Sequence, residues 1–106
     1  MAENSITDDV GTKLLFENDR VRVWDLQLAL GEQMPFHRHS SDYLYVVIGG
    51  GELQTVFPDG TADSPREMKD GDVRFREVPG EAVHAARNVG SSPWRNIVVE
   101  LKRSGS

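Results

Sequence analysis

The stretch PFHRHSSDYLYVV, residues 35–47, joins two histidines at alternate positions to an aromatic and β-branched run. Side chains two residues apart on a β-strand project from the same face, so His37 and His39 can aim at one point. The run 43–48 that follows them has the composition of a buried strand. The stretch therefore predicts β-structure that carries two imidazoles side by side.

Similar patterns recur along the chain. Strand-like runs occupy 20–30, 52–57, 72–78, 82–88 and 94–101, and turn residues separate them. We expect 43–48 and 52–57 to pair as a hairpin across the glycines at 49–51. A change of apolar parity at Val23 and Trp24 predicts a bulge there. About seven or eight short strands without a long helical period predict an all-β sandwich or barrel.

Length and composition bound the class of protein. The 106 residues suit one domain, which we place at 13–101 between a flexible N-terminal segment, 1–12, and a C-terminal tail, 102–106. A net charge of -5 argues against nucleic acid as a partner. No apolar run reaches the length of about 18 residues that a membrane span needs, and the polar, acidic start is unlike a secretory signal. We therefore expect a cytoplasmic protein with no membrane partner.

The chain has no cysteine, so any metal must be held by nitrogen and oxygen atoms. Its third histidine, His84, lies in the strand-like run 82–88. If the sheets close on themselves, the three imidazoles converge, and in the neutral state they offer lone pairs that a divalent cation satisfies. The alternative is that each histidine is hydrogen bonded independently in the core.

The residues around the histidines resemble the two motifs of the cupin superfamily. The first motif, G-x5-HxH-x3–4-E-x6-G, is matched by Gly31, His37, His39 and Gly50, and the second by Gly71, Pro79, His84 and Asn88. All three histidines fall on histidine positions of these motifs. The likeness covers residues 13–101 and is closest to small single-domain bacterial cupins, including the one associated with β-alanine degradation.

This resemblance implies a jelly-roll β-barrel, often a homodimer, in which His37, His39 and His84 hold one divalent transition metal. Imidazole ligands suit iron, nickel, zinc, manganese and copper, and do not choose among them. We expect a metal-dependent, dioxygenase-like enzyme whose small-molecule substrate is an organic acid or related metabolite. The alternatives are a non-catalytic metal- or metabolite-binding cupin and an isomerase or lyase that uses the metal as a Lewis acid.

In the cupin motif a glutamate ligand stands where this chain has Tyr43. Three arrangements remain open at this position. The three histidines can be completed by water, Asp42 can reach the metal if the strand bulges, or Tyr43 can hydrogen bond a metal-bound ligand. A phenol with a pKa near 10 is a poor ligand unless the metal ionises it. Asp42 and Tyr43 are therefore the candidate catalytic residues.

Other side chains are placed by residue type. Trp24 and Trp94 are expected in the core or at a dimer contact, and Phe75 is a candidate for the barrel lining. Arg74 and Arg76 share one strand face, which we expect to be solvated. On an inner wall they would instead select an anionic substrate.

Overall fold

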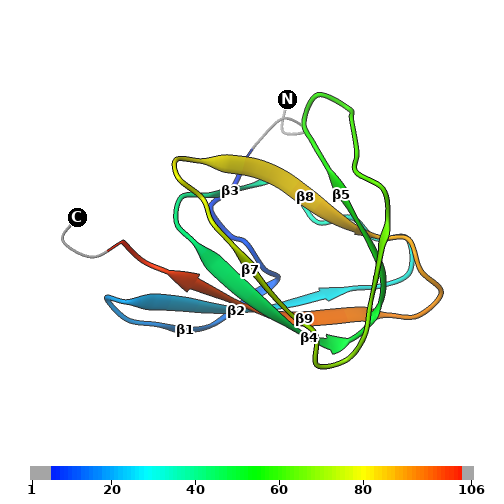
Figure 1. The fold of residues 1–106 in the computed structure, drawn as a ribbon, viewed down its shortest axis with the longest axis horizontal. Helices are drawn as coiled ribbons and strands as arrows, with labels where there is room; N and C mark the ends of the chain where they lie inside the picture. Colours follow the sequence, from blue (N-terminus) through cyan, green and yellow to red (C-terminus); the bar gives the residue numbers. More distant parts are fainter. Residues whose placement is uncertain (1–5, 104–106) are drawn as a thin grey trace.

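The computed structural model describes residues 6–103, which form nine β-strands and no helix (Figure 1). The all-β prediction is confirmed. With no helix in this range, there is none that could cross a membrane. The strands are β1 (Lys13–Glu17), β2 (Val21–Leu28), β3 (His37–His39), β4 (Tyr43–Gly49), β5 (Gly51–Val56), β6 (Arg66–Met68), β7 (Val73–Arg76), β8 (Ala82–Asn88) and β9 (Trp94–Leu101).

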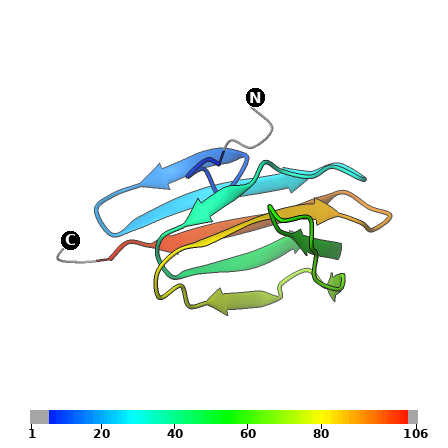
Figure 2. The same cartoon turned by 90° about the horizontal axis from the view of Figure 1, so that it is seen from above.

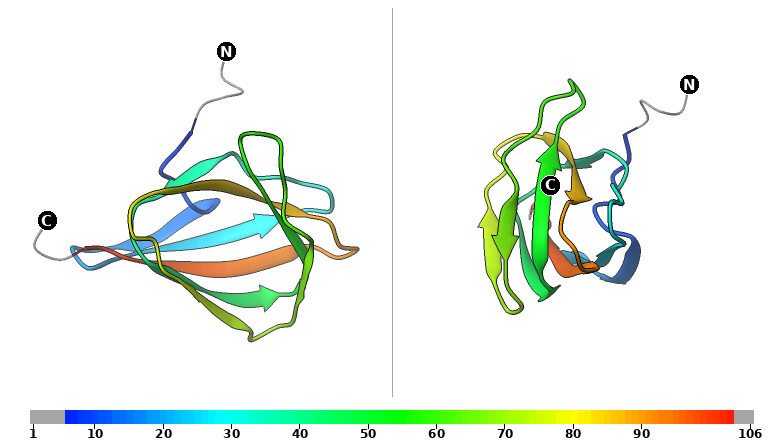
Figure 3. Two further views of the ribbon diagram at one scale, coloured as in Figure 1. Left: turned by 45° about the horizontal axis from the view of Figure 1, so that its top comes forward. Right: turned by 90° about the vertical axis from the view of Figure 1, so that its right-hand side faces the viewer.

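Two antiparallel sheets face each other across the interior (Figures 1 and 3). The larger sheet has the order β1-β2-β9-β4-β7, and the smaller has the order β3-β8-β5-β6. Figure 2 shows the strands of the larger sheet side by side beneath β3 and β8. The short strand β3 has one full partner, β8, and its other edge meets Thr7 through an isolated bridge at His37.

The predicted hairpin between 43–48 and 52–57 is wrong. Strand β4 pairs with β7 and β9 in the larger sheet, whereas β5 pairs with β6 and β8 in the smaller one. The glycines between them form a corner at which the chain changes sheets. A Cβ at Gly50 would come within 2.4 Å of the backbone oxygen of Met68, so this corner has no room for a side chain.

The bulge near Val23 and Trp24 is also misplaced. Strand β2 pairs with β9 in unbroken register, and the irregularity lies on β1, between Leu14 and Phe16, which face Trp24 and Val23. Because β1 is an edge strand, it can take up an extra residue without disturbing a second neighbour.

The core has two parts. One holds Leu26, Leu28, Met34, Val47, Met68, Ala85 and Trp94, and the other holds Val10, Trp24, Tyr43, Val78 and Val98. Both tryptophans are therefore core residues. Val10 comes from the segment that precedes 13–101, and its side chain is buried. Residues 1–5 and 104–106, which carry part of the predicted N-terminal segment and tail, lie outside the described residues.

The two faces of the larger sheet carry unexpected residues. Tyr43 on β4 pairs with Arg76 on β7, and Leu44 pairs with Phe75. Because Tyr43 points into the core, Arg74 and Arg76 share the inner side and Phe75 lies outside, with 52% of its surface exposed. The expectations of a barrel-lining Phe75 and a solvated outer face for Arg74 and Arg76 are both wrong.

Candidate metal centre

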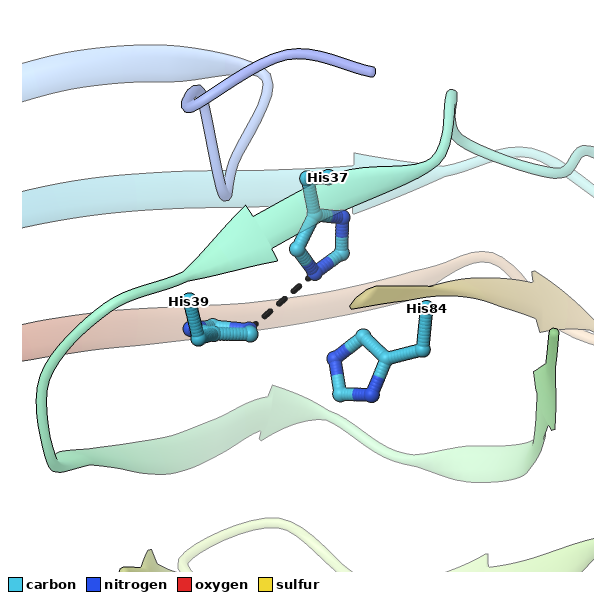
Figure 4. A group of neighbouring side chains, drawn as sticks. All are labelled: His37, His39 and His84. Carbon is cyan, nitrogen blue, oxygen red and sulfur yellow. Dashed lines mark hydrogen bonds between the residues drawn. The ribbon is translucent and has the colours of Figure 1, made fainter. Parts of the chain in front are cut away.

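Adjacent strands of the smaller sheet bring the three histidines together. His37 on β3 lies directly opposite His84 on β8 in the register. His39 follows two residues later on β3, so all three side chains project from the inner face of this sheet. Figure 4 shows the three rings gathered between the sheets. The convergence predicted from alternate positions therefore occurs, through a cross-strand pair that the sequence spacing does not reveal.

The three imidazoles form a nearly regular triangle. Their ring centroids are 4.8, 4.8 and 4.9 Å apart, and each pair of rings is edge-on. One ring nitrogen from each histidine lies within 4.8 Å of the others. The closest approach is 3.1 Å, between Nε2 of His37 and Nε2 of His39 (Figure 4). The three histidines are thus positioned to bind a metal ion.

The environment keeps these rings neutral near pH 7. Burial lowers the pKa of His37 to about 4, with a further contribution from His84. Burial and the two neighbouring histidines lower the pKa of His39 to about 2. The pKa of His84 is lowered by burial and by the positive charge of Arg76, against a smaller opposing effect of Asp63. Neutral imidazoles are the form that ligates metals.

The donor set fits a divalent transition metal. Nδ1 of His37 lies 3.4 Å from the carbonyl oxygen of Pro35, and donation there leaves Nε2 as the lone-pair atom facing His39. Nδ1 of His39 is buried and has no hydrogen-bond partner within residues 6–103. At a metal–nitrogen distance of about 2.1 Å, adjacent ligands stand roughly 3.0 Å (octahedral) to 3.4 Å (tetrahedral) apart. The 3.1 Å separation of the two Nε2 atoms lies in that range.

Tyr43 and Asp42 have different surroundings. The Tyr43 ring stacks on the His39 imidazole, with centroids 3.9 Å apart and planes 10° from parallel. Burial, and to a smaller extent Tyr45, raises the pKa of Tyr43 to about 12, so its phenol stays protonated. Asp42 instead accepts a 2.7 Å hydrogen bond from the backbone nitrogen of Val78. Its carboxylate is held by this hydrogen bond to the segment after β7, and Asp42 is not among the residues that line the histidine cavity.

A cavity of about 250 Å³ opens beside the histidines. Besides apolar side chains, its lining includes two arginines, Arg66 and Arg76, and two carboxylates, Asp63 and Glu77. Sequence reasoning missed Arg66 and Asp63, which lie between the predicted strand-like runs 52–57 and 72–78. For the other arginine of the cavity, Arg76, the sequence did offer a signal, its alternation with Arg74 on one strand face. We had expected that face to be the solvated outer one, and it is the inner one.

Asn88, which matches the second cupin motif, has a structural role. Its side chain is buried, and Nδ2 donates to the backbone oxygens of Leu28 and Ser92. Oδ1 accepts a hydrogen bond from the backbone nitrogen of Gly90. Asn88 therefore ties the turn after β8 to the end of β2, and its motif position reflects folding.

Comparison with known proteins identifies the fold. No protein-family model and no curated protein matches the chain. Among solved structures, a cupin domain from Bordetella pertussis Tohama I superposes with a TM-score of 0.74 at 24% identity, covering 86% of this chain and 91% of that one. An RmlC-like cupin family protein with a double-stranded β-helix fold, from Methanocaldococcus jannaschii, gives 0.66 at 26% identity, with coverages of 85% and 77%.

A third similar structure is a sugar phosphate isomerase from a cupin superfamily, from Silicibacter pomeroyi DSS-3. Its TM-score is 0.54 at 20% identity, and the match covers 79% of this chain and 52% of that one. These likenesses establish that the chain has the cupin double-stranded β-helix fold, as the resemblance implied. The similar structures are cupins, and the β-alanine-associated subgroup remains a prediction.

Proposed function

We propose that this chain is a metal-dependent enzyme in which His37, His39 and His84 hold iron, nickel, zinc, manganese or copper. The observation that carries the proposal is the triangle of three neutral imidazoles, two of them buried and that of His84 partly buried, beside a cavity of about 250 Å³. A three-histidine set leaves coordination positions for a substrate. The proposed reaction is dioxygenase-like, on a small organic acid or related metabolite.

The chain supplies the scaffold for this chemistry. The paired strands β3 and β8 fix the histidine spacing, and Tyr43 holds the plane of His39 by stacking. The apolar part of the cavity wall lies beside the histidines and, with a substrate bound, would limit their contact with bulk water. When bound, the metal would polarise an oxygen atom of the substrate or, if redox-active, take part in dioxygen chemistry.

The test measures metal content first. Wild-type protein is stripped with chelator, reloaded with each of the five metals, and compared with His37→Ala and His84→Ala by elemental analysis. We expect one metal per wild-type chain and a loss of affinity of more than about a hundredfold in each variant. Arg74→Gln serves as the control, because Arg74 lies outside the cavity lining. Wild type that retains no metal under any of these loadings contradicts the proposal.

The reaction type is tested separately. Dioxygen consumption is followed with the iron-loaded protein over a panel of small organic acids, and products are analysed with and without dioxygen. We expect turnover that stops when dioxygen is removed. A protein that binds metal stoichiometrically but turns over no panel member would support a non-catalytic binding role.

A Lewis-acid isomerase or lyase is the second candidate. Asp63 and Glu77 line the same cavity and offer carboxylates as general bases, the groups that proton abstraction beside a carbonyl requires. The similar Silicibacter pomeroyi structure is described as a sugar phosphate isomerase. Turnover that is unchanged without dioxygen, and that is lost in Asp63→Asn or Glu77→Gln, would favour this candidate.

We also propose that the chain forms a homodimer through the outer face of the larger sheet. The row Phe16, Val23, Val99, Leu44 and Phe75 runs across all five strands in register. Its members are uncharged, and Phe16 and Phe75 are more than half exposed. A second copy related by a twofold axis offers the same apolar row in return, so the face is complementary to itself.

A further inference from the structure

The histidine cavity is lined by two arginines, Arg66 and Arg76, that form no ion pair with another described residue. Ion pairs within residues 6–103 involve Arg22, Arg38, Arg95 and Lys102, and none involves Arg66 or Arg76. Neither guanidinium makes a hydrogen bond to another described residue. Asp63 and Glu77 line the same cavity, yet neither is within ion-pair distance of either arginine.

Arg76 lies close to the histidine cluster. It lies opposite Tyr43 in the pairing of β7 with β4, and Tyr43 stacks on His39. After burial, its positive charge is the next cause of the lowered pKa of His84, and it offsets part of the rise in the pKa of Tyr43, so it acts on both side chains. Arg66 lines the cavity from β6 of the other sheet, and its charge also offsets a small part of the rise in the pKa of Tyr43. The two sheets therefore each contribute one arginine to the lining of the same cavity.

We propose that Arg66 and Arg76 form a carboxylate subsite, which anchors one end of a short dicarboxylate while its other oxygen-bearing end faces the three histidines. This inference rests on the proposed function and names its substrate class. A planar guanidinium donates two parallel hydrogen bonds to a carboxylate, which gives orientation as well as affinity. The apolar wall provided by Leu26, Met34 and Val98 suits the methylene carbons between the two ends.

The acidic side chains of the cavity select among anions. Asp63 and Glu77 sit in the lining and would repel a doubly charged phosphate group at the arginines more strongly than one carboxylate group there, because the other carboxylate of the ligand lies at the histidines. A cavity of about 250 Å³ also limits the ligand to a few carbon atoms. Arg66 and Arg76 are thus specificity-determining residues for a short organic diacid.

The test measures binding by isothermal titration calorimetry, with succinate as the probe and succinamide as its uncharged equivalent. Wild type, Arg66→Gln, Arg76→Gln and the double variant are titrated both stripped and zinc-loaded. We expect saturable succinate binding to wild type, no succinamide binding, and a loss of about tenfold or more in each single variant. The Arg76→Lys variant keeps the positive charge but cannot donate two parallel hydrogen bonds to a carboxylate. It should therefore bind succinate with an affinity between those of wild type and Arg76→Gln.

Arg74→Gln is the matched control, because Arg74 occupies the same face of β7 two residues away but does not line the cavity. Its succinate affinity should equal that of wild type. The inference is overturned if zinc-loaded wild type shows no succinate binding, or if the double variant binds succinate as tightly as wild type does. It is also overturned if wild type binds inorganic phosphate more tightly than succinate. Zinc content, measured on the same samples, separates this result from failure of the metal site. If wild type takes up no zinc, the stripped protein still tests the arginine subsite.

Discussion

The two faces of the larger sheet are built from the same strands, and each combines apolar with polar side chains. On β9, the inner face presents Trp94, Asn96, Val98 and Glu100, while Arg95, Ile97, Val99 and Leu101 point outward. Glu100 is buried and accepts hydrogen bonds from Arg22 and from the indole nitrogen of Trp24. The outer face in turn carries the ion pair between Arg95 and Asp25, so both faces mix polar and apolar side chains. Polarity alone is therefore a poor guide to which face of this sheet is buried.

Acid should lower the free energy of unfolding mainly through the three histidines on the inner side of the molecule. This is the largest effect we expect. The folded chain holds the pKa of His37 near 4, below the ordinary value of 6.5, and lowers the pKa values of the other two histidines. Between these two pH values the unfolded chain binds more protons than the folded chain, so lowering the pH destabilises the fold. For His37 alone, the free energy of unfolding of metal-free protein should fall by about 3 kcal/mol from pH 6.5 to pH 4.

Urea denaturation of chelator-treated protein at a series of pH values measures this slope. The His37→Gln variant should show a smaller pH dependence of the free energy of unfolding, because it lacks one of the titrating imidazoles. A wild-type stability that stays constant between pH 7 and pH 5 would contradict the neutral, buried state of the histidines.

Equal truncations on the two faces compare their packing directly. Val47 is 1% exposed on the inner face of β4, and Val73 is 53% exposed on the outer side of neighbouring β7. Val47→Ala should lower the free energy of unfolding by about 2 kcal/mol, because it removes buried methyl groups and leaves a void. Val73→Ala should change it by less than about 0.5 kcal/mol in dilute solution. Similar losses in the two variants, measured by urea denaturation, would mean that both faces are buried in the monomer.

The outer face is tested by its effect on association. Phe75→Ser removes an apolar ring from the proposed dimer contact and should raise the dimer dissociation constant by about tenfold. Sedimentation velocity over a range of concentrations measures this change. Glu67→Ser, an exposed substitution on the smaller sheet, is the control. A wild-type protein that is monomeric at all concentrations would disprove the proposed dimer.

The smallest effect should come from the Tyr43 hydroxyl. Tyr43→Phe keeps the ring stacked on His39, so metal affinity should change by less than about twofold. Tyr43→Leu removes the stacking and should weaken metal binding by about tenfold. Competition with a chelating dye measures both affinities. If the Phe variant loses as much affinity as the Leu variant, the hydroxyl itself contributes to the site.

Much of the site could be predicted because it depends on local periodicity. His37 and His39 share a face on any β-strand, and the runs 82–88 and 94–101 coincide with β8 and β9. The fold followed from the strand pattern together with the two cupin-like motifs. These features need only the alternation of residues and the short-range turn chemistry of the chain.

The remaining features depend on long-range pairing, which periodicity does not encode. The side on which Arg76 lies is set by its pairing with Tyr43, thirty-three positions earlier in the chain. The apolar Val73 and Phe75 on the same strand favoured the opposite assignment, because apolar residues usually face the core. The hairpin prediction was wrong for a similar reason. Three consecutive glycines are compatible with a tight hairpin turn and equally with a corner at which the chain passes from one sheet to the other.

The bridge at Thr7 has a consequence for the strand that carries two of the histidines. The backbone nitrogen of Thr7 donates to Phe36, and its oxygen accepts from the nitrogen of Arg38. These bonds occupy the edge of β3 that β8 leaves free, and an unpaired edge is where a foreign strand can add. Deleting residues 1–12 would therefore leave this edge of β3 unpaired beside the histidine cluster, and we expect such a variant to aggregate more readily than the full chain.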